Sequence, residues 1–101
     1  MKVLWTRESL EQLVEIERYI AKDSPIIAQQ FVEHLVEQGD ALSRNPRIGR
    51  IVPEISNENI RERIIKNYRL VYRLNKDKIE ILTVFEGHRL LRTLDIEQDE
   101  K

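Results

Sequence analysis

The chain has 101 residues, of which 41% are hydrophobic and 35% charged, and its formal net charge is −1. This length supports one small domain with a single core. No apolar run approaches the roughly 20 residues that cross a bilayer, and the N-terminus lacks the apolar core of a secretory signal. The chain contains no cysteine, which excludes disulfides and thiolate metal sites. We therefore expect a single cytoplasmic domain with no membrane segment and no metal or other cofactor.

The small net charge conceals an uneven distribution of charged residues. Residues 46–92 carry 11 basic and 6 acidic side chains, whereas residues 1–45 carry 5 and 8, and residues 93–101 carry 1 and 4. A basic centre of this kind suits a polyanionic partner or an acidic protein. Strand edges and solvated sheet faces also carry Lys and Arg, so charge alone leaves both interpretations open.

The N-terminal half has the periodicity of two helices. The apolar run at residues 3–5 predicts a short strand. Thr6 follows it and can serve as the N-cap of a helix over residues 7–22. The Asp-Ser-Pro sequence at residues 23–25 ends this helix and begins a second one, because serine is a good N-cap and proline fits the first helical position. The second helix is expected to run to about residue 43. A connection this short predicts an antiparallel helical hairpin.

The C-terminal half alternates between apolar and charged residues, which is the pattern of half-buried strands. Strands are predicted over residues 61–65, 68–74 and 79–85, with hairpin turns at 66–67 and 75–78. The last of these strands is mostly apolar, as expected for a central strand covered on both faces. The segment before them, residues 45–59, is rich in turn-forming residues and predicts a loop.

These elements predict an α+β fold in the order β-α-α-β-β-β. The helical hairpin is expected to pack on one face of a small, largely antiparallel sheet. Residues 90–94 suit either one more short strand or a helical turn. We expect a single domain over residues 1–94 and an acidic, frayed tail over residues 95–101.

The middle strand predicts a core-facing side and a basic side. Tyr68, Leu70, Tyr72 and Leu74 share one face, and Arg69, Val71 and Arg73 share the other. The tyrosines are expected to face the core, with their hydroxyls reaching its edge. The arginines predict an exposed basic face, next to which Glu54 and Glu62 are expected to pair with neighbouring arginines.

A series of short motifs runs from residue 3 to residue 92. The series is Trp5, Tyr-Ile-Ala at 19–21, Ser-Pro at 24–25, Phe-Val-Glu-His-Leu at 31–35, Asn-Pro-Arg-Ile-Gly-Arg at 45–50, Val-Pro-Glu at 52–54, Arg-Glu at 61–62, Tyr-Arg-Leu-Val-Tyr-Arg at 68–73, Ile-Glu-Ile-Leu-Thr-Val at 79–84 and Arg-Leu-Leu-Arg at 89–92. In order and spacing it resembles the RelE/ParE superfamily of bacterial type II toxins, and it is more similar to the ParE branch. The resemblance implies a toxin that is neutralised by a cognate antitoxin.

The superfamily implies two alternative activities on one fold. ParE-like members poison DNA gyrase, which is the activity we expect, whereas RelE-like members act on the ribosome and cleave mRNA without a metal. Arg69 and Arg89 match two arginines of the RelE-like pattern, and His88 is a candidate acid or base beside them. That pattern also has a tyrosine near the C-terminus, and this chain has Leu-Asp-Ile-Glu at residues 94–97 instead. This departure favours the gyrase alternative, which needs no catalytic group.

The partner-binding residues are expected among the arginines of the sheet and its ends. They are Arg61, Arg63, Arg69, Arg73, Arg89 and Arg92. An acidic antitoxin tail is expected to bind them beside a groove of the helical hairpin, and charge reversal at Arg69 or Arg73 should then weaken the complex.

Four further residues have competing structural explanations. Trp5 is expected to pack between helices and sheet, and His34 to be structural. Arg47 and Arg50 suit either backbone carbonyl contacts that fix their loop or contact with a partner.

Overall fold

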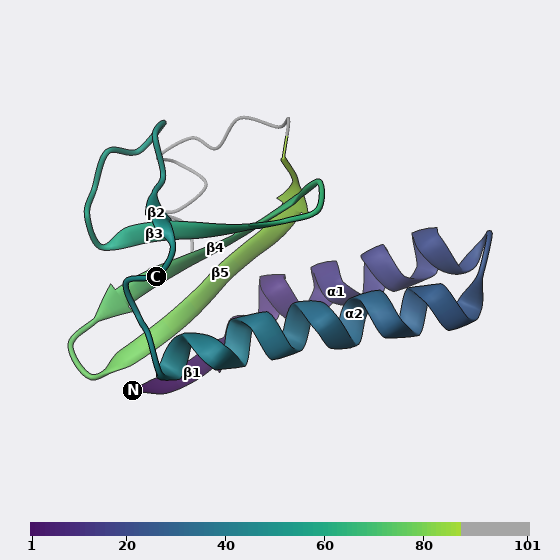
Figure 1. Ribbon diagram of the computed structural model, residues 1–101, viewed down its shortest axis with the longest axis horizontal. Coiled ribbons are helices and arrows are strands. Elements are labelled where there is room, and N and C mark those ends of the chain that lie inside the picture. The colour runs from purple at the N-terminus through teal and green to yellow at the C-terminus, as the bar shows by residue number, and fades with distance from the viewer. Residues whose placement is uncertain (88–101) are drawn as a thin grey trace.

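The structure, a computed structural model, describes residues 1–87. Two helices, α1 (Arg7–Ala21) and α2 (Pro25–Asp40), lie along one side of a five-stranded sheet (Figure 1). The remaining elements are β1 (Lys2–Trp5), a 3₁₀ helix η1 (Ala41–Ser43), β2 (Arg50–Ile51), β3 (Ile60–Ile65), β4 (Tyr68–Asn75) and β5 (Lys78–Glu86). The predicted α+β fold, with a helical hairpin on one sheet face, is confirmed.

The strands lie in the order β1-β5-β4-β3-β2. Strand β1 runs parallel to β5, and every other neighbouring pair is antiparallel. The two-residue strand β2 was not predicted, because residues 45–59 were expected to form a loop throughout. Two residues are too few to show an alternating pattern, so only the pairing of Arg50 with Glu62 and of Ile51 with Arg61 identifies this strand.

Both helices begin as the sequence predicts. The Thr6 side chain accepts a hydrogen bond from the Ser9 backbone N–H at 3.2 Å, and the Ser24 side chain accepts one from the Ile27 N–H at 3.3 Å. Such caps satisfy N–H groups that have no partner within the helix. The α-helical part of the second helix ends at Asp40, earlier than predicted, and the chain continues through η1 to Ser43.

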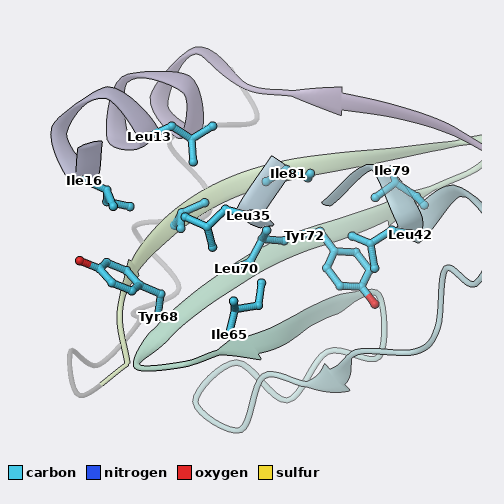
Figure 2. Close-up of a cluster of buried hydrophobic side chains, with 11 residues drawn as sticks. Leu13, Ile16, Leu35, Leu42, Ile65, Tyr68, Leu70, Tyr72, Ile79 and Ile81 are labelled. Carbon is cyan, nitrogen blue, oxygen red and sulfur yellow. The ribbon is translucent and has the colours of Figure 1, made fainter. Parts of the chain in front are cut away.

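The main core lies between the helices and the sheet (Figure 2). Tyr68, Leu70 and Tyr72 of β4 face this core, which confirms the predicted face of the middle strand. Trp5 packs against the same cluster, as expected. The buried side chains of the main core are Leu13, Ile16, Leu35, Leu42, Ile65, Tyr68, Leu70, Tyr72, Ile79, Ile81 and Val84.

A second, smaller core lies on the opposite sheet face. We call residues 52–59, between β2 and β3, the covering loop. Its Val52 and Ile55 pack with buried residues of the strands, namely Ile60, Val71, Leu82 and Phe85. Strand β5 therefore supplies residues to both cores, as predicted for a central strand. A register shift at Val71/Tyr72 leaves Leu82 without an opposite residue on β4, so the alternation of β5 changes phase there.

Gly39 allows α2 to pack closely against the sheet. A Cβ added at this position would lie 2.7 Å from Ile81 Cδ1 and would also overlap the ring of Trp5. The indole N–H donates to Asp40 Oδ1 at 3.1 Å, which holds the ring in place. Gly39 is thus explained by the close approach of a large aromatic side chain.

Gly39→Ala is therefore expected to destabilise the protein. Alanine favours a helix by about 1 kcal/mol over glycine, but overpacking a filled core costs typically about 1–3 kcal/mol. Urea unfolding should show a lower midpoint for this variant, whereas the exposed control Glu37→Ala should stay within about 0.5 kcal/mol of the parent. A higher midpoint for Gly39→Ala would contradict the packing explanation.

No helix within residues 1–87 is long and apolar enough to cross a membrane. His88, Arg89 and Arg92 lie outside the described residues, as do residues 90–94 and the tail at 95–101. The domain boundary at residue 94 stays a prediction.

Candidate functional site

Arg69 lies inside an ion-pair cluster on the sheet face opposite the helices. Its Nε donates to Glu62 Oε1 at 2.6 Å, while Nη1 and Nη2 donate to the two oxygens of Glu54 at 2.6 and 2.8 Å. The guanidinium carbon also lies 5.3 Å from the centroid of the Phe85 ring. Only 5% of the Arg69 side chain is exposed. The expectation of an exposed arginine at this position is therefore wrong.

Glu62 extends the cluster to β2. Its side chain is fully buried, and its second oxygen accepts from Arg50 Nε at 2.7 Å. The predicted pairing of Glu54 and Glu62 with arginines is confirmed. The series Glu54–Arg69–Glu62–Arg50 joins the covering loop to three adjacent strands. Buried charges persist only when they are paired, so these residues depend on one another.

Arg69 keeps its charge in this cluster, and its partners limit what it can do chemically. The hydrogen bond that Arg69 donates to Glu54, with a further contribution from Glu62, raises the pKa of Arg69 above its ordinary value against the effect of burial. A phosphate group is best held by two parallel N–H groups of a guanidinium. In Arg69 those groups face Glu54. The arginine that matches the RelE-like pattern is therefore used within the fold.

Arg73 is also paired within the sheet. Its Nε donates to Glu80 Oε1 at 3.0 Å, and the two side chains are 12% and 18% exposed. Burial acts to raise the pKa of Glu80, but hydrogen bonds from Arg73 and Asn75 outweigh it and lower the pKa. Glu80 thus contributes stability that is present above about pH 4.3, the ordinary glutamate pKa, and is lost as pH falls through the lower folded value. The predicted exposure of Arg73 is wrong as well.

Arg61 and Arg63 are half-buried on β3. Arg61 Nη1 donates to the Gly49 carbonyl at 3.0 Å, and its Nε donates to the Glu58 carbonyl at 2.9 Å. Arg63 Nη2 donates a hydrogen bond to Gln38 Oε1 of α2 at 3.4 Å. Carbonyl contacts that fix the loop were one of the two explanations offered for Arg47 and Arg50, and Arg61 makes contacts of this kind.

The hydroxyl of Tyr72 holds the loop before β2. It accepts from the Gly49 N–H at 3.0 Å and donates to the Pro46 carbonyl at 2.8 Å, while the ring lies in the main core (Figure 2). Burial raises the pKa of Tyr72, so the hydroxyl keeps the proton it donates. A Cβ at Gly49 would lie 2.6 Å from the Glu62 carbonyl oxygen, so the loop can approach the sheet only with glycine there.

A groove lies between the helical hairpin and the β3–β4 turn. The end of the hairpin projects beyond the sheet (Figure 1). The groove has a volume of about 440 Å³, and exposed apolar side chains such as Tyr19 (64%) and Ile27 (58%) line it. The expectation that His34 is structural did not anticipate its place here, exposed on this lining. The lining residues are Tyr19, Ile20, Ile27, Gln30, Phe31, His34, Lys66, Asn67 and Tyr68.

Sequence reasoning found the helical hairpin but not which residues line the groove. Residues 26 and 27 look alike in sequence, and only the orientation of the first turn of α2 decides which of them faces the groove. Within residues 1–87, no group of three or more His, Cys, Asp or Glu side chains could hold a metal ion.

Comparison with solved structures supports the fold. The chain is similar to a structure of the chromosomal ParDE toxin-antitoxin system from P. aeruginosa, with 24% identity and a TM-score of 0.71 over 85% of this chain and 95% of that chain. It is also similar to the YoeB dimer from Staphylococcus aureus, with 17% identity and a TM-score of 0.54 over 88% and 98% of the two chains. A YoeB–YefM complex from the same organism has 17% identity and a TM-score of 0.52 over 84% and 94%. At such identities these likenesses establish the fold alone.

Sequence comparison identifies the family. No curated sequence is similar enough to count as a match. The model of the family described as "ParE toxin of type II toxin-antitoxin system, parDE" matches residues 3–91, which is nearly the whole chain. A match of that extent agrees with the fold and with the resemblance found in the sequence motifs. The chain belongs to the ParE toxin family of type II toxin-antitoxin systems.

Proposed function

We propose that this toxin inhibits DNA gyrase by binding to it, without catalysing a reaction of its own. The observation that supports this most strongly is the pairing of Arg69 with Glu54 and Glu62. Metal-independent RNA cleavage needs cations near the phosphate, a base and an acid. Arg69 is held away from such a role, and the family is the one in which gyrase is the expected target. We infer a cytoplasmic site of action, where gyrase is found.

We also propose that the groove binds the cognate antitoxin. An amphipathic helix needs an apolar cleft of this kind, and the exposed Tyr19 and Ile27 side chains together with the half-buried Phe31 supply the anchoring surface. Lys66, at the β3–β4 turn, can meet an acidic residue of that helix. The complex described as a ParDE system in P. aeruginosa supports an antitoxin partner, and the groove is our assignment of its position.

The RelE-like alternative, ribosome-dependent mRNA cleavage, would use His88, Arg69 and Arg89. Of these only Arg69 lies within the described residues, and its guanidinium faces carboxylates. The roles of Arg89 and Arg92 in partner binding stay predictions. Charge reversal at Arg69 or Arg73 would now act through folding first, so neither variant isolates the antitoxin interface.

A supercoiling assay tests the gyrase proposal. Purified toxin should inhibit gyrase in proportion to its concentration and should trap cleaved DNA, and stoichiometric antitoxin should restore supercoiling. Heat-denatured toxin is the control for nonspecific inhibition. Full gyrase activity at a toxin concentration well above that of the enzyme would refute the proposed target.

A further inference from the structure

The loop that leads into β2 has a fixed backbone and exposed side chains. We call residues 46–51 the arginine loop. Tyr72 holds it at Pro46 and Gly49, and Arg61 donates to the Gly49 carbonyl. Its last two residues pair with β3. Loops on a protein surface are usually mobile, so this many anchors on one short segment indicates that its conformation matters.

The side chains of the arginine loop point outward. Arg47, Ile48, Arg50 and Ile51 are exposed, with half of Ile48 accessible to solvent. Ile64, also half-exposed, lies on β3 beyond the short β2, on the same sheet face as Glu62. Single exposed isoleucines are ordinary, but two within six residues of a fixed loop and a third nearby form a surface.

This surface is basic as well as apolar. The arginine loop contains two arginines, Arg47 and Arg50, and no acidic residue. Arg50 is paired with Glu62 within the fold, but its side chain is still 61% exposed. Arg47 is exposed, so the loop presents a net positive charge. Electrostatic complementarity therefore favours an acidic partner.

The side chains of this surface suit a protein partner better than a nucleic acid. A nucleic acid backbone gains from arginine but not from exposed isoleucine, and proteins that bind single strands stack the bases mainly on aromatic side chains. The arginine loop has no aromatic residue. Interfaces between proteins, by contrast, combine apolar centres with arginine, and a fixed loop loses little entropy on binding.

We propose that the arginine loop together with Ile64 is the surface through which the toxin contacts its protein target, and that it fits an acidic patch surrounding an apolar hollow. This inference rests on the proposed function, because it assigns the target-binding surface. None of these residues lines the groove assigned to the antitoxin. Toxicity and antitoxin binding should therefore be separable by mutation.

The test compares two double variants. R47E/I48D reverses the charge of one side chain of the arginine loop and replaces an apolar side chain with a carboxylate. R44E/V14D makes the same two kinds of change at exposed residues outside both surfaces. Toxicity is measured as loss of viable cells on expression, antitoxin affinity by calorimetry, and folding by urea unfolding. R47E/I48D should lose at least about tenfold in toxicity with antitoxin affinity and unfolding midpoint unchanged, while R44E/V14D should remain toxic.

Other outcomes overturn the inference in distinguishable ways. Full toxicity of R47E/I48D would remove the loop from the target interface, and an equal loss of antitoxin affinity would assign the loop to the antitoxin instead. Cleavage of ribosome-bound mRNA by the parent toxin, lost in R47E/I48D, would make the surface a nucleic-acid contact.

The result also separates the surface from the proposed target. If the parent chain is toxic and the loop variant is not, but the parent does not inhibit gyrase, the surface assignment stands and gyrase is not the target. A parent chain without toxicity would refute the proposed function, and the surface with it.

Discussion

Arg69→Met is expected to destabilise the protein by about 3–5 kcal/mol, because it leaves a buried carboxylate without its main partner. Glu62 is fully buried, and in the variant its remaining partner would be Arg50, whose side chain is 61% exposed. Glu54 would lose its ion pair with Arg69, which is one of the contacts that join the covering loop to β4. Urea unfolding of the purified protein measures the effect.

Two controls make the Arg69 experiment specific. Arg47→Met removes the same charge from an exposed position and should change stability by no more than about 0.5 kcal/mol. Adding Glu62→Leu to Arg69→Met should recover much of the loss, because replacing a buried ion pair with apolar residues is often neutral. An Arg69→Met protein as stable as the parent would mean that the arginine serves partners and not the fold.

Ile27→Asp is expected to weaken antitoxin binding by about 2–4 kcal/mol, or roughly 30- to 1,000-fold in Kd. A carboxylate in the apolar groove would be desolvated by the bound helix and would repel an acidic partner. The substitution should not harm the fold, since Ile27 is largely exposed and the first turn of a helix favours an acidic residue.

The neighbouring residue supplies a matched control for this groove variant. Ile26 is an isoleucine in the same turn, 71% exposed, and it does not line the groove. Ile26→Asp should bind the antitoxin within about twofold of the parent. Equal losses of affinity by calorimetry for the two variants would place the antitoxin elsewhere on the helices.

Most of the fold could be predicted from the sequence because it follows from local patterns. The caps at Thr6 and Ser24 and the alternation on β4 are local signals, and each was found where expected. Strand β2 could not be predicted, because it is defined by pairing with β3 and not by its own two residues. The end of α2 was misplaced by three residues, since a 3₁₀ turn continues the helical pattern.

The site was predicted less well, because the pattern of charged residues in the sequence does not show which of their side chains are buried. Alternation on β4 correctly placed Arg69 opposite the core face, and we expected that face to be open to solvent. The covering loop closes it, and Glu54 comes from that loop, 15 residues away from Arg69 in sequence. An arginine on a sheet face is exposed or buried according to such distant partners. The available signal was the presence of Glu54 and Glu62 near several arginines. It predicted that these carboxylates pair with arginines, but not that the pairs are buried.

The central claim is that this toxin acts by binding a protein and not by catalysis. Programmed ribosomes carrying a defined mRNA test it most directly, with the same toxin preparation assayed in parallel on gyrase. We predict that the mRNA stays intact at toxin concentrations that abolish supercoiling. Codon-phased cleavage of the mRNA, abolished by His88→Ala or Arg89→Ala, would contradict the claim and establish the RelE-like activity.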